Sequence, residues 1–242
     1  MKNLKDKVAV ITGGNSGIGY ATARVLKENR AKVIITGRRK EAIEKAASAL
    51  NVSGLLADQS NLSDIDVLVT KVKEGFGKVD ILLINAGITK FAPIESTTED
   101  MFDEIMNVNF KGAYFTLSKF IPVLNDNASV ILLSSTSATI SPQNASVYAA
   151  SKAAINAVMK IAALELASRK IRVNAVSPGP VATEIMNKLG LDDSVEAKII
   201  NSIPLSRLGK AKEVADLIAY LSGDDASFIT GSNFLIDGGQ SV

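Results

Sequence analysis

Tyr148 and Lys152 stand four residues apart, a spacing that places two side chains on the same face of a helix. A free tyrosine hydroxyl titrates near pH ~10, and a neighbouring ammonium lowers that pKa because it favours the phenolate. A tyrosine tuned in this way can exchange a proton with a carbonyl or alcohol oxygen at moderate pH. The pair therefore indicates acid–base chemistry at an oxygen, although two residues in surface contact would show the same spacing.

A glycine-rich turn near the N-terminus follows an apolar run that reads as a buried strand. Its sequence is Thr12-Gly13-Gly14-Asn15-Ser16-Gly17-Ile18-Gly19, and a helical pattern follows it. Glycines let a backbone approach a pyrophosphate, and the N-terminus of the next helix supplies N–H groups and the positive end of its dipole. The turn therefore predicts a dinucleotide site. The alternative is a turn that only packs strand against helix, because the glycine spacing differs from the usual G-x-G-x-x-G.

Further motifs follow in chain order, and together they carry a resemblance to a known family. They are Asn85-Ala86-Gly87, Asn109, Ser135 thirteen positions before Tyr148, Pro178-Gly179 with Thr183, and Asp237-Gly238-Gly239. With the glycine turn and Tyr148-x-x-x-Lys152, they make nearly the whole chain similar to the short-chain dehydrogenase/reductase family. This resemblance implies hydride transfer between NAD(P)(H) and a ketone or secondary alcohol, in an enzyme that is usually a homotetramer.

The resemblance also assigns catalytic roles to four residues. Tyr148 is expected to exchange the proton with the substrate oxygen, and Ser135 to hydrogen-bond that oxygen. Lys152 is expected to lower the pKa of Tyr148 and to hold the nicotinamide ribose. Asn109 is expected at a helix kink, where it supports a water. Ser134 is the competing serine, and the thirteen-residue spacing favours Ser135.

The residues expected to bind the cofactor come from several parts of the chain. They are Gly13, Asn15, Ser16, Gly17, Ile18, Gly19, Arg38, Arg39, Asp58, Gln59, Asn85, Ala86, Gly87, Tyr148, Lys152, Pro178, Gly179, Val181 and Thr183. Asp58 is expected to accept a hydrogen bond from the adenine amino group, unless it caps the following helix instead. Val181 and Thr183 are expected at the nicotinamide carboxamide.

The second predicted strand ends in Gly37-Arg38-Arg39, which bears on the choice of cofactor. NAD-dependent relatives usually carry an acid where Gly37 stands, and Arg38 could pair with a 2′-phosphate. These two positions favour NADP(H). NAD(H) stays possible, because Ser16 stands where NADP(H)-preferring relatives often carry a second basic residue. The alternative is that Arg38 and Arg39 are simply solvated ahead of the next helix.

Apolar runs alternate with helical patterns along the chain. Strands are predicted at 8–12, 32–36, 54–57, 80–85, 129–134, 172–176 and 233–236, and helices at 19–29, 41–50, 63–76, 98–124, 146–168 and 212–221. This alternation predicts one α/β domain over residues 1–242, a Rossmann-like doubly wound fold whose seven-stranded parallel sheet has helices on both faces. The motifs follow predicted strands, so they should meet at the carboxyl edge of the sheet, where such folds bind ligands.

The segment 184–205 is expected to cover the substrate. Its apolar residues are Ile185, Met186, Leu189, Ile199, Ile200, Ile203 and Leu205, and Ser137, Gln143, Asn144 and Ala145 are expected to complete the pocket. Such a wall suits a hydrophobic ketone or secondary alcohol. The alternatives are a 3-oxoacyl-carrier-protein reductase, for which Arg169-Lys170 could attract the acidic carrier, and a sugar or polyol dehydrogenase. A different class is a non-catalytic NADP(H)-sensing regulator, against which the four intact catalytic positions argue.

Composition narrows the chemistry further. The 242 residues include no cysteine and no histidine, which excludes disulfides, thiolate chemistry, histidine bases and a Ser-His-Asp triad. No paired-acid spacing suggests a metal, and a net charge of +2 gives no case for nucleic acid. No signal peptide or charge-free membrane span is evident, so a cytoplasmic location is expected. Two positions depart from the family pattern: Ile84 replaces an asparagine, and Arg30 replaces a helix-ending glycine.

Overall fold

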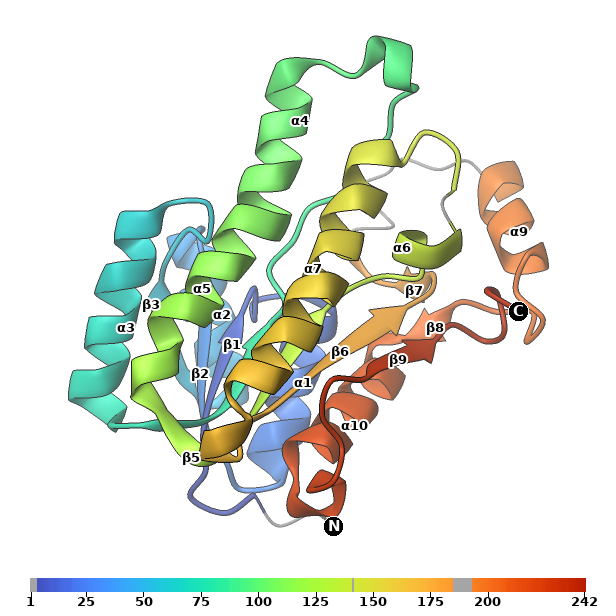
Figure 1. Ribbon diagram of the computed structural model, residues 1–242. Helices are drawn as coiled ribbons and strands as arrows, with labels where there is room; N and C mark the ends of the chain where they lie inside the picture. Colours follow the sequence, from blue (N-terminus) through green and yellow to red (C-terminus); the bar gives the residue numbers. More distant parts are fainter. Residues whose placement is uncertain (1–3, 141, 185–192) are drawn as a thin grey trace.

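Seven parallel strands form one sheet at the centre of the computed structural model, which describes residues 4–140, 142–184 and 193–242 (Figure 1). The strands are β1 (Val8–Thr12), β2 (Lys32–Gly37), β3 (Ser53–Leu56), β4 (Val79–Ile84), β5 (Leu124–Leu133), β6 (Arg172–Pro178) and β9 (Asn233–Ile236). Their order across the sheet is β3-β2-β1-β4-β5-β6-β9, and every pairing is parallel. The predicted seven-stranded, doubly wound fold is confirmed.

Strand β1 shows why the sheet is covered on both faces. All five of its residues are buried, and alternate side chains enter different cores. Val8 and Val10 belong to one core, whereas Ala9 and Ile11 belong to the other. Because successive strand residues point to opposite faces, a continuous apolar run requires helices on both sides.

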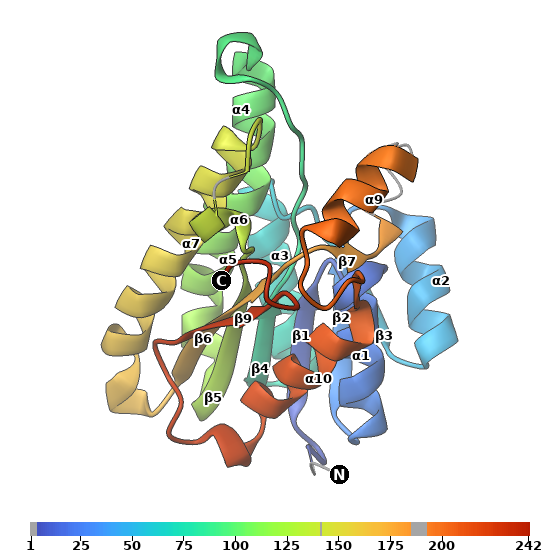
Figure 2. The same cartoon turned by 90° about the vertical axis from the view of Figure 1, so that its right-hand side faces the viewer.

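Two helical layers enclose the sheet (Figure 2). One layer contains α1 (Gly17–Glu28), α2 (Lys40–Leu50) and α10 (Ala211–Ser222). The other contains α3 (Leu62–Phe76), α4 (Glu99–Met106), α5 (Ala113–Phe120) and α7 (Ser146–Glu165). Among the described helices, α7 alone has a length and composition that would suit a membrane span, yet it packs against β6 and α4 as a core helix does.

The predicted helix over 98–124 differs from the structure in a way that matters for the site. A π-helix (Asn107–Gly112) interrupts it at the place where a kink was expected. A 3₁₀ turn (Ile121–Val123) with Pro122 ends it. Leu124 pairs with Val79, so β5 begins five residues before its predicted start, ahead of a register irregularity. Similarly, α7 ends at Glu165 rather than 168, and a 3₁₀ turn (Ala167–Arg169) follows it.

Short elements lie near the carboxyl edge of the sheet. They are the 3₁₀ turn Ile94–Ser96, α6 (Ser137–Ile140), α9 (Asp193–Asn201), and the parallel pair β7 (Val181–Ala182) and β8 (Gly209–Lys210). Two-residue strands carry no readable periodicity, so the pair was not predicted. The β7–β8 pair brings together the residues that flank the expected covering segment, 184–205. Helices α7 and α9 lie on either side of this edge of the sheet (Figure 2).

Candidate active site

A cavity of about 810 Å³ opens at the carboxyl edge of the sheet. It is lined by every residue predicted to bind the cofactor except Gly19, and also by Ser135. The strand order changes direction between β1 and β4, which is where open α/β sheets bind their ligands. The motifs therefore meet at the carboxyl edge of the sheet, as predicted.

The glycine turn fits a pyrophosphate. Gly13 and Gly17 have φ values of 65° and 54°, a conformation that suits glycine. Ser16 precedes α1 without capping it through its side chain, and no acid occupies the first turn. The first N–H groups and the positive dipole end thus remain available to an anion. Gly19 serves packing instead, since a Cβ there would lie 2.3 Å from the Gly13 oxygen.

The end of β2 is crowded at Gly37, where NAD-dependent relatives usually carry an acid. A Cβ at Gly37 would lie 2.7 Å from the Asn15 Oδ1 and 3.0 Å from the Ile43 Cδ1. Arg38 and Arg39 are exposed at the cavity, and neither side chain has a hydrogen-bond or ion-pair partner among the residues that the structure describes. Two guanidinium groups are thus available to an anionic ligand.

Asp58 is not a helix cap. Its carboxylate accepts hydrogen bonds from the Ser60 N–H at 2.9 Å and the Ser60 hydroxyl at 2.7 Å. The cap of α3 is Asn61, whose Oδ1 accepts from the Ser63 N–H at 3.0 Å. Asp58 lines the cavity, so its position is compatible with the predicted hydrogen bond from the adenine amino group.

Two side-chain amides join the site segments. Asn85 Nδ2 donates to the Thr12 and Gly13 oxygens at 2.9 and 3.1 Å, which ties the turn after β4 to the glycine turn. Gln59 Nε2 donates to the Ala86 and Val108 oxygens, both at 3.0 Å. Gln59 thereby links the end of β3, the turn after β4 and the π-helix.

Asn109 lies behind the cavity wall rather than in it, with only 1% of its surface exposed. Its Oδ1 accepts from the Ile88 N–H at 2.8 Å, and its Nδ2 donates to the Ile88 oxygen at 2.9 Å. The same Nδ2 lies 3.3 Å from the Ser151 hydroxyl. Asn109 therefore fixes the loop that follows Gly87.

Lys152 and Tyr148 both face the cavity from α7. Lys152 Nζ donates to the Leu133 oxygen at 2.8 Å and lies 5.9 Å from the centroid of the Tyr148 ring. Burial lowers the pKa of Lys152 to about 8. Burial also raises the pKa of Tyr148, and a hydrogen bond with the Ser135 side chain only partly opposes it. The expected lowering of the Tyr148 pKa by Lys152 is thus wrong for this structure, because desolvation of the phenolate dominates.

The two candidate serines have different environments. Ser134 is buried, and its hydroxyl donates to the Lys152 backbone oxygen at 3.1 Å. Ser135 accepts from the Ser137 N–H at 3.1 Å and bonds with Tyr148 in the cavity. Ser134 therefore anchors α7 to the sheet, whereas Ser135 is placed for chemistry.

The segment after β6 is only partly described. Thr183 lies over the glycine turn, 3.5 Å from where a Gly17 Cβ would be. Ile185, Met186 and Leu189 lie outside the described residues. Ile199 lines the cavity, whereas Ile203 is buried against Gly238.

Several cavity residues had not been singled out in the sequence. Phe91, Ile140, Val195 and Gln240 line it alongside the expected Ser137, Gln143 and Asn144, whereas Ala145 is buried elsewhere. Phe91 follows Gly87 by four residues, so an aromatic just after a predicted site turn was the available signal. Ile140, Val195 and Gln240 carry no local signal, because only the tertiary fold brings them to this edge.

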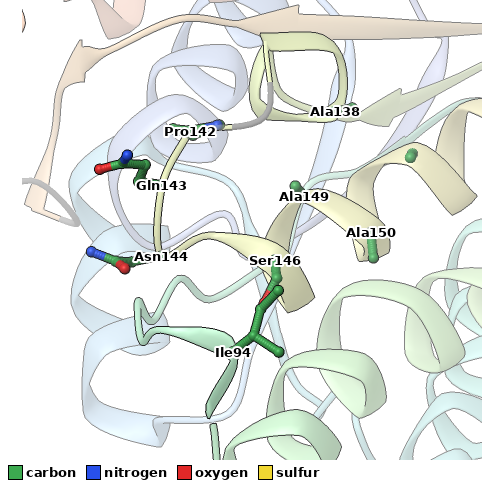
Figure 3. A pocket seen from close by; sticks show the side chains of 9 residues that line it. Ile94, Ala138, Pro142, Gln143, Asn144, Ser146, Ala149 and Ala150 are labelled. Carbon is green, nitrogen blue, oxygen red and sulfur yellow. The ribbon is translucent and has the colours of Figure 1, made fainter. Parts of the chain in front are cut away.

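A second, smaller cavity of about 430 Å³ lies on the opposite face of α7 (Figure 3). Its lining includes Ile94, Ser146, Ala149 and Ala150, and none of the four predicted catalytic side chains. Residues 146, 149, 150 and 153 share one helix face, and Tyr148 and Lys152 share the other. This cavity adjoins the large one, with which it shares Pro142, Gln143 and Asn144, but Ser135, Tyr148 and Lys152 line only the large one.

Arg169-Lys170 lie at the edge of the sheet opposite the large cavity, just before β6 begins. Arg169 bonds with the Asp126 carboxylate at 2.9 Å and with the Ile121 and Leu124 oxygens. Attraction of an acidic carrier by this pair stays a prediction, and the pair does not line the active-site cavity of this chain.

The chain is similar to known proteins over nearly its whole length. A family model described as enoyl-(acyl carrier protein) reductase matches residues 13–241. The 3-oxoacyl-(acyl-carrier-protein) reductase FabG of Thermotoga maritima is 36% identical over 246 residues, which cover 99% of each chain. A mutant short-chain dehydrogenase/reductase of Serratia marcescens superposes with a TM-score of 0.94 at 33% identity, covering 99% of this chain and 100% of the other. A blue fluorescent protein from a metagenomic library, solved in complex with NADPH, gives a TM-score of 0.94 at 28% identity with 100% of each chain covered.

Proposed function

The chain belongs to the short-chain dehydrogenase/reductase family of oxidoreductases, and we propose that it is an NADP(H)-preferring carbonyl reductase and secondary alcohol dehydrogenase. The proposal rests above all on one observation. A single cavity contains Ser135, Tyr148 and Lys152 together with a glycine turn suited to a pyrophosphate. We propose a hydrophobic ketone as the substrate, because Phe91, Ile140 and Ile199 contribute to the lining.

The cofactor site follows from residues that fit a dinucleotide. Gly13–Gly19 and the N-terminus of α1 would hold the pyrophosphate, and Arg38 would pair with a 2′-phosphate. Asp58 would bind the adenine amino group, and Val181 and Thr183 the carboxamide. When bound, the nicotinamide supplies the hydride in reduction and accepts it in oxidation. The crowding at Gly37 and the available Arg38 support NADP(H) over NAD(H).

Tyr148 is proposed to act as the general acid in reduction. The pKa of Tyr148 is raised by burial, so its hydroxyl keeps its proton at neutral pH. It can donate this proton to the substrate oxygen. Ser135 hydrogen-bonds the same oxygen and holds it near Tyr148. In oxidation, Tyr148 takes the proton from the alcohol.

Lys152 and Asn109 support this proton transfer. The pKa of Lys152 is about 8, so at pH 7 most molecules carry an ammonium beside the phenolate that forms. A Cβ at Gly87 would lie 3.2 Å from the Asn109 Oδ1 and 3.5 Å from the Lys152 Nζ, so both groups lie close to Gly87. We propose that Asn109 supports a water through which Lys152 recovers protons from solvent. A homotetramer, a cytoplasmic location and a covering role for 184–205 stay proposals.

A 3-oxoacyl-carrier-protein reductase is the second candidate, favoured by the similarity to the Thermotoga maritima protein. Two features disfavour it. Arg169-Lys170 lie at the far edge of the sheet, and α4, beside the cavity, carries Glu99, Asp100, Asp103 and Glu104. Such acids repel an acidic carrier. The apolar lining likewise disfavours a sugar or polyol, and a regulator that only senses NADP(H) has no need of the catalytic groups.

Steady-state oxidation of NADPH and NADH tests the proposal, with a panel of aromatic ketones, keto esters, a 3-oxoacyl thioester and a sugar ketone. We expect turnover of hydrophobic ketones with NADPH preferred. Turnover restricted to the thioester would establish the second candidate. Cofactor binding without turnover of any carbonyl, or of alcohols in reverse, would replace the enzyme with the regulator.

A further inference from the structure

Phe91 presents an aromatic ring beside the proposed general acid. Its ring centroid lies 6.4 Å from that of Tyr148, and the two planes meet at 73°, an edge-to-face arrangement. The side chain lines the cavity, yet Phe91 keeps 46% of its surface exposed. An aromatic residue is thus half covered by the protein and half open toward the place where the substrate would lie.

The loop that carries Phe91 is fixed on both sides of it. Lys90 forms an ion pair with Glu104 on α4. On the other side, the Ala92 N–H donates to the Asn144 oxygen at 2.8 Å. Because both neighbours of Phe91 are anchored, the backbone at this position is fixed, and the ring is presented beside Tyr148. A fixed wall of this kind selects among substrates better than a mobile one.

Three of the aliphatic side chains that line the cavity come from α6 and α9, outside the elements that carry the catalytic groups. Ile140 comes from α6, and Val195 and Ile199 come from α9. A carbonyl whose oxygen is bound by Tyr148 and Ser135 must place its substituents in this same cavity. One substituent therefore meets an aromatic ring beside Tyr148 and branched aliphatic groups from the other elements.

We propose that Phe91 is a specificity-determining residue, which forms with Ile140, Val195 and Ile199 a subsite for an aryl group on the carbonyl carbon. This inference rests on the carbonyl reductase function proposed above and names its substrate class. An aryl ring gains from edge-to-face or offset stacking on Phe91 beyond the area it buries, and a saturated ring of the same size does not. The gain corresponds to a preference of about 2- to 10-fold.

The test compares acetophenone with cyclohexyl methyl ketone, which have similar size but differ in aromaticity. The measured quantity is the ratio of their kcat/KM values in wild type, Phe91→Leu and Phe91→Tyr. Comparing this ratio between variants cancels the intrinsic reactivity of each ketone. Phe102→Leu is the matched control, because Phe102 is 47% exposed on α4 and does not line the described cavity. NADPH affinity, measured by fluorescence, checks that each variant folds.

We expect Phe91→Leu to lower the kcat/KM for acetophenone, relative to that for cyclohexyl methyl ketone, about 2- to 10-fold with unchanged NADPH affinity. Phe91→Tyr and Phe102→Leu should leave this ratio within twofold of wild type. A ratio that stays constant in Phe91→Leu, whether both activities fall together or neither changes, overturns the aryl subsite while leaving the reductase intact. If wild type binds NADPH but reduces neither ketone, the proposed function fails and the subsite fails with it.

Discussion

The ammonium of Lys152 donates a hydrogen bond to the backbone oxygen of Leu133, the last residue of β5, at 2.8 Å. This bond joins α7 to the carboxyl edge of the sheet and holds the charge of Lys152 within the protein. Only 4% of the Lys152 surface is exposed, so one backbone oxygen replaces most of its hydration. The group proposed to support proton transfer is therefore costly to the folded state.

This cost should appear in the pH dependence of stability. The folded pKa of Lys152 is lowered to about 8, so between pH 8 and the ordinary lysine value the unfolded chain binds more protons. Stability then rises with pH across that window. Compared with Lys152→Met, the wild type should gain about 2–3 kcal/mol between pH 7.5 and 10 in urea unfolding. A constant difference between the two proteins would show that Lys152 is not desolvated. Tyr148, whose folded pKa is raised, lowers stability as the pH approaches and passes the ordinary tyrosine value of 10.0, and this effect is common to the two proteins compared.

Arg30 provides a prediction outside the site. It follows α1 with a φ of 70°, a left-handed conformation that favours the glycine found in relatives. Its side chain is exposed, so Arg30→Gly should remove backbone strain without loss of packing and stabilise the protein by about 0.5–1 kcal/mol. Lys27→Gly, inside the same helix, should destabilise by a similar amount. If the melting temperatures of both variants shift in the same direction, the backbone strain assigned to Arg30 would be contradicted.

Arg38 should decide the choice of cofactor. Loss of a charge-assisted hydrogen bond with the 2′-phosphate costs roughly 1.5–3 kcal/mol. Arg38→Ala should therefore weaken NADPH binding about 10- to 100-fold and leave NADH binding within twofold. Lys40→Ala is the control, since Lys40 is exposed next to Arg39 but does not line the cavity. Equal weakening of NADPH and NADH in calorimetric titrations would mean that Arg38 does not read the phosphate.

Gln59 should be structurally essential although it is uncharged. Leucine at this position leaves the Ala86 and Val108 oxygens without their donor, and unsatisfied buried groups cost about 1–3 kcal/mol each. Gln59→Leu should lower the free energy of unfolding by at least that amount, whereas Gln143→Leu, in an exposed loop, should change it by less than about 0.5 kcal/mol. Equal stability of the two variants would show that the π-helix does not need this link.

The sequence predicted the seven strands and the edge at which they deliver the motifs, because continuous apolar runs and glycine turns are local signals. The preference for Ser135 over Ser134 came from spacing, and their different surroundings agree with it. Arg30 was also recognisable in the sequence, because it stands where a glycine often ends the first helix, and the structure gives it the positive φ that such a glycine would adopt.

Other features depend on contacts that no local pattern records. The space that Gly37 leaves is limited by Asn15 and Ile43, which come from separate elements. The direction of the Tyr148 pKa shift was mispredicted, because helical spacing reports the nearby Lys152 but not the burial of the hydroxyl. Phe91 lies beside Tyr148 in a loop whose neighbouring residues, Lys90 and Ala92, contact segments distant in the sequence.

The most direct test of the central claim is single-turnover reduction by Tyr148→Phe with NADPH bound. If Tyr148 donates the proton, the rate should fall about 10²- to 10⁴-fold while NADPH affinity stays within twofold. Tyr114→Phe is the control, because Tyr114 is 44% exposed on α5 and does not line the described cavity. A Tyr148→Phe rate within threefold of wild type would contradict the assignment of Tyr148 as the general acid.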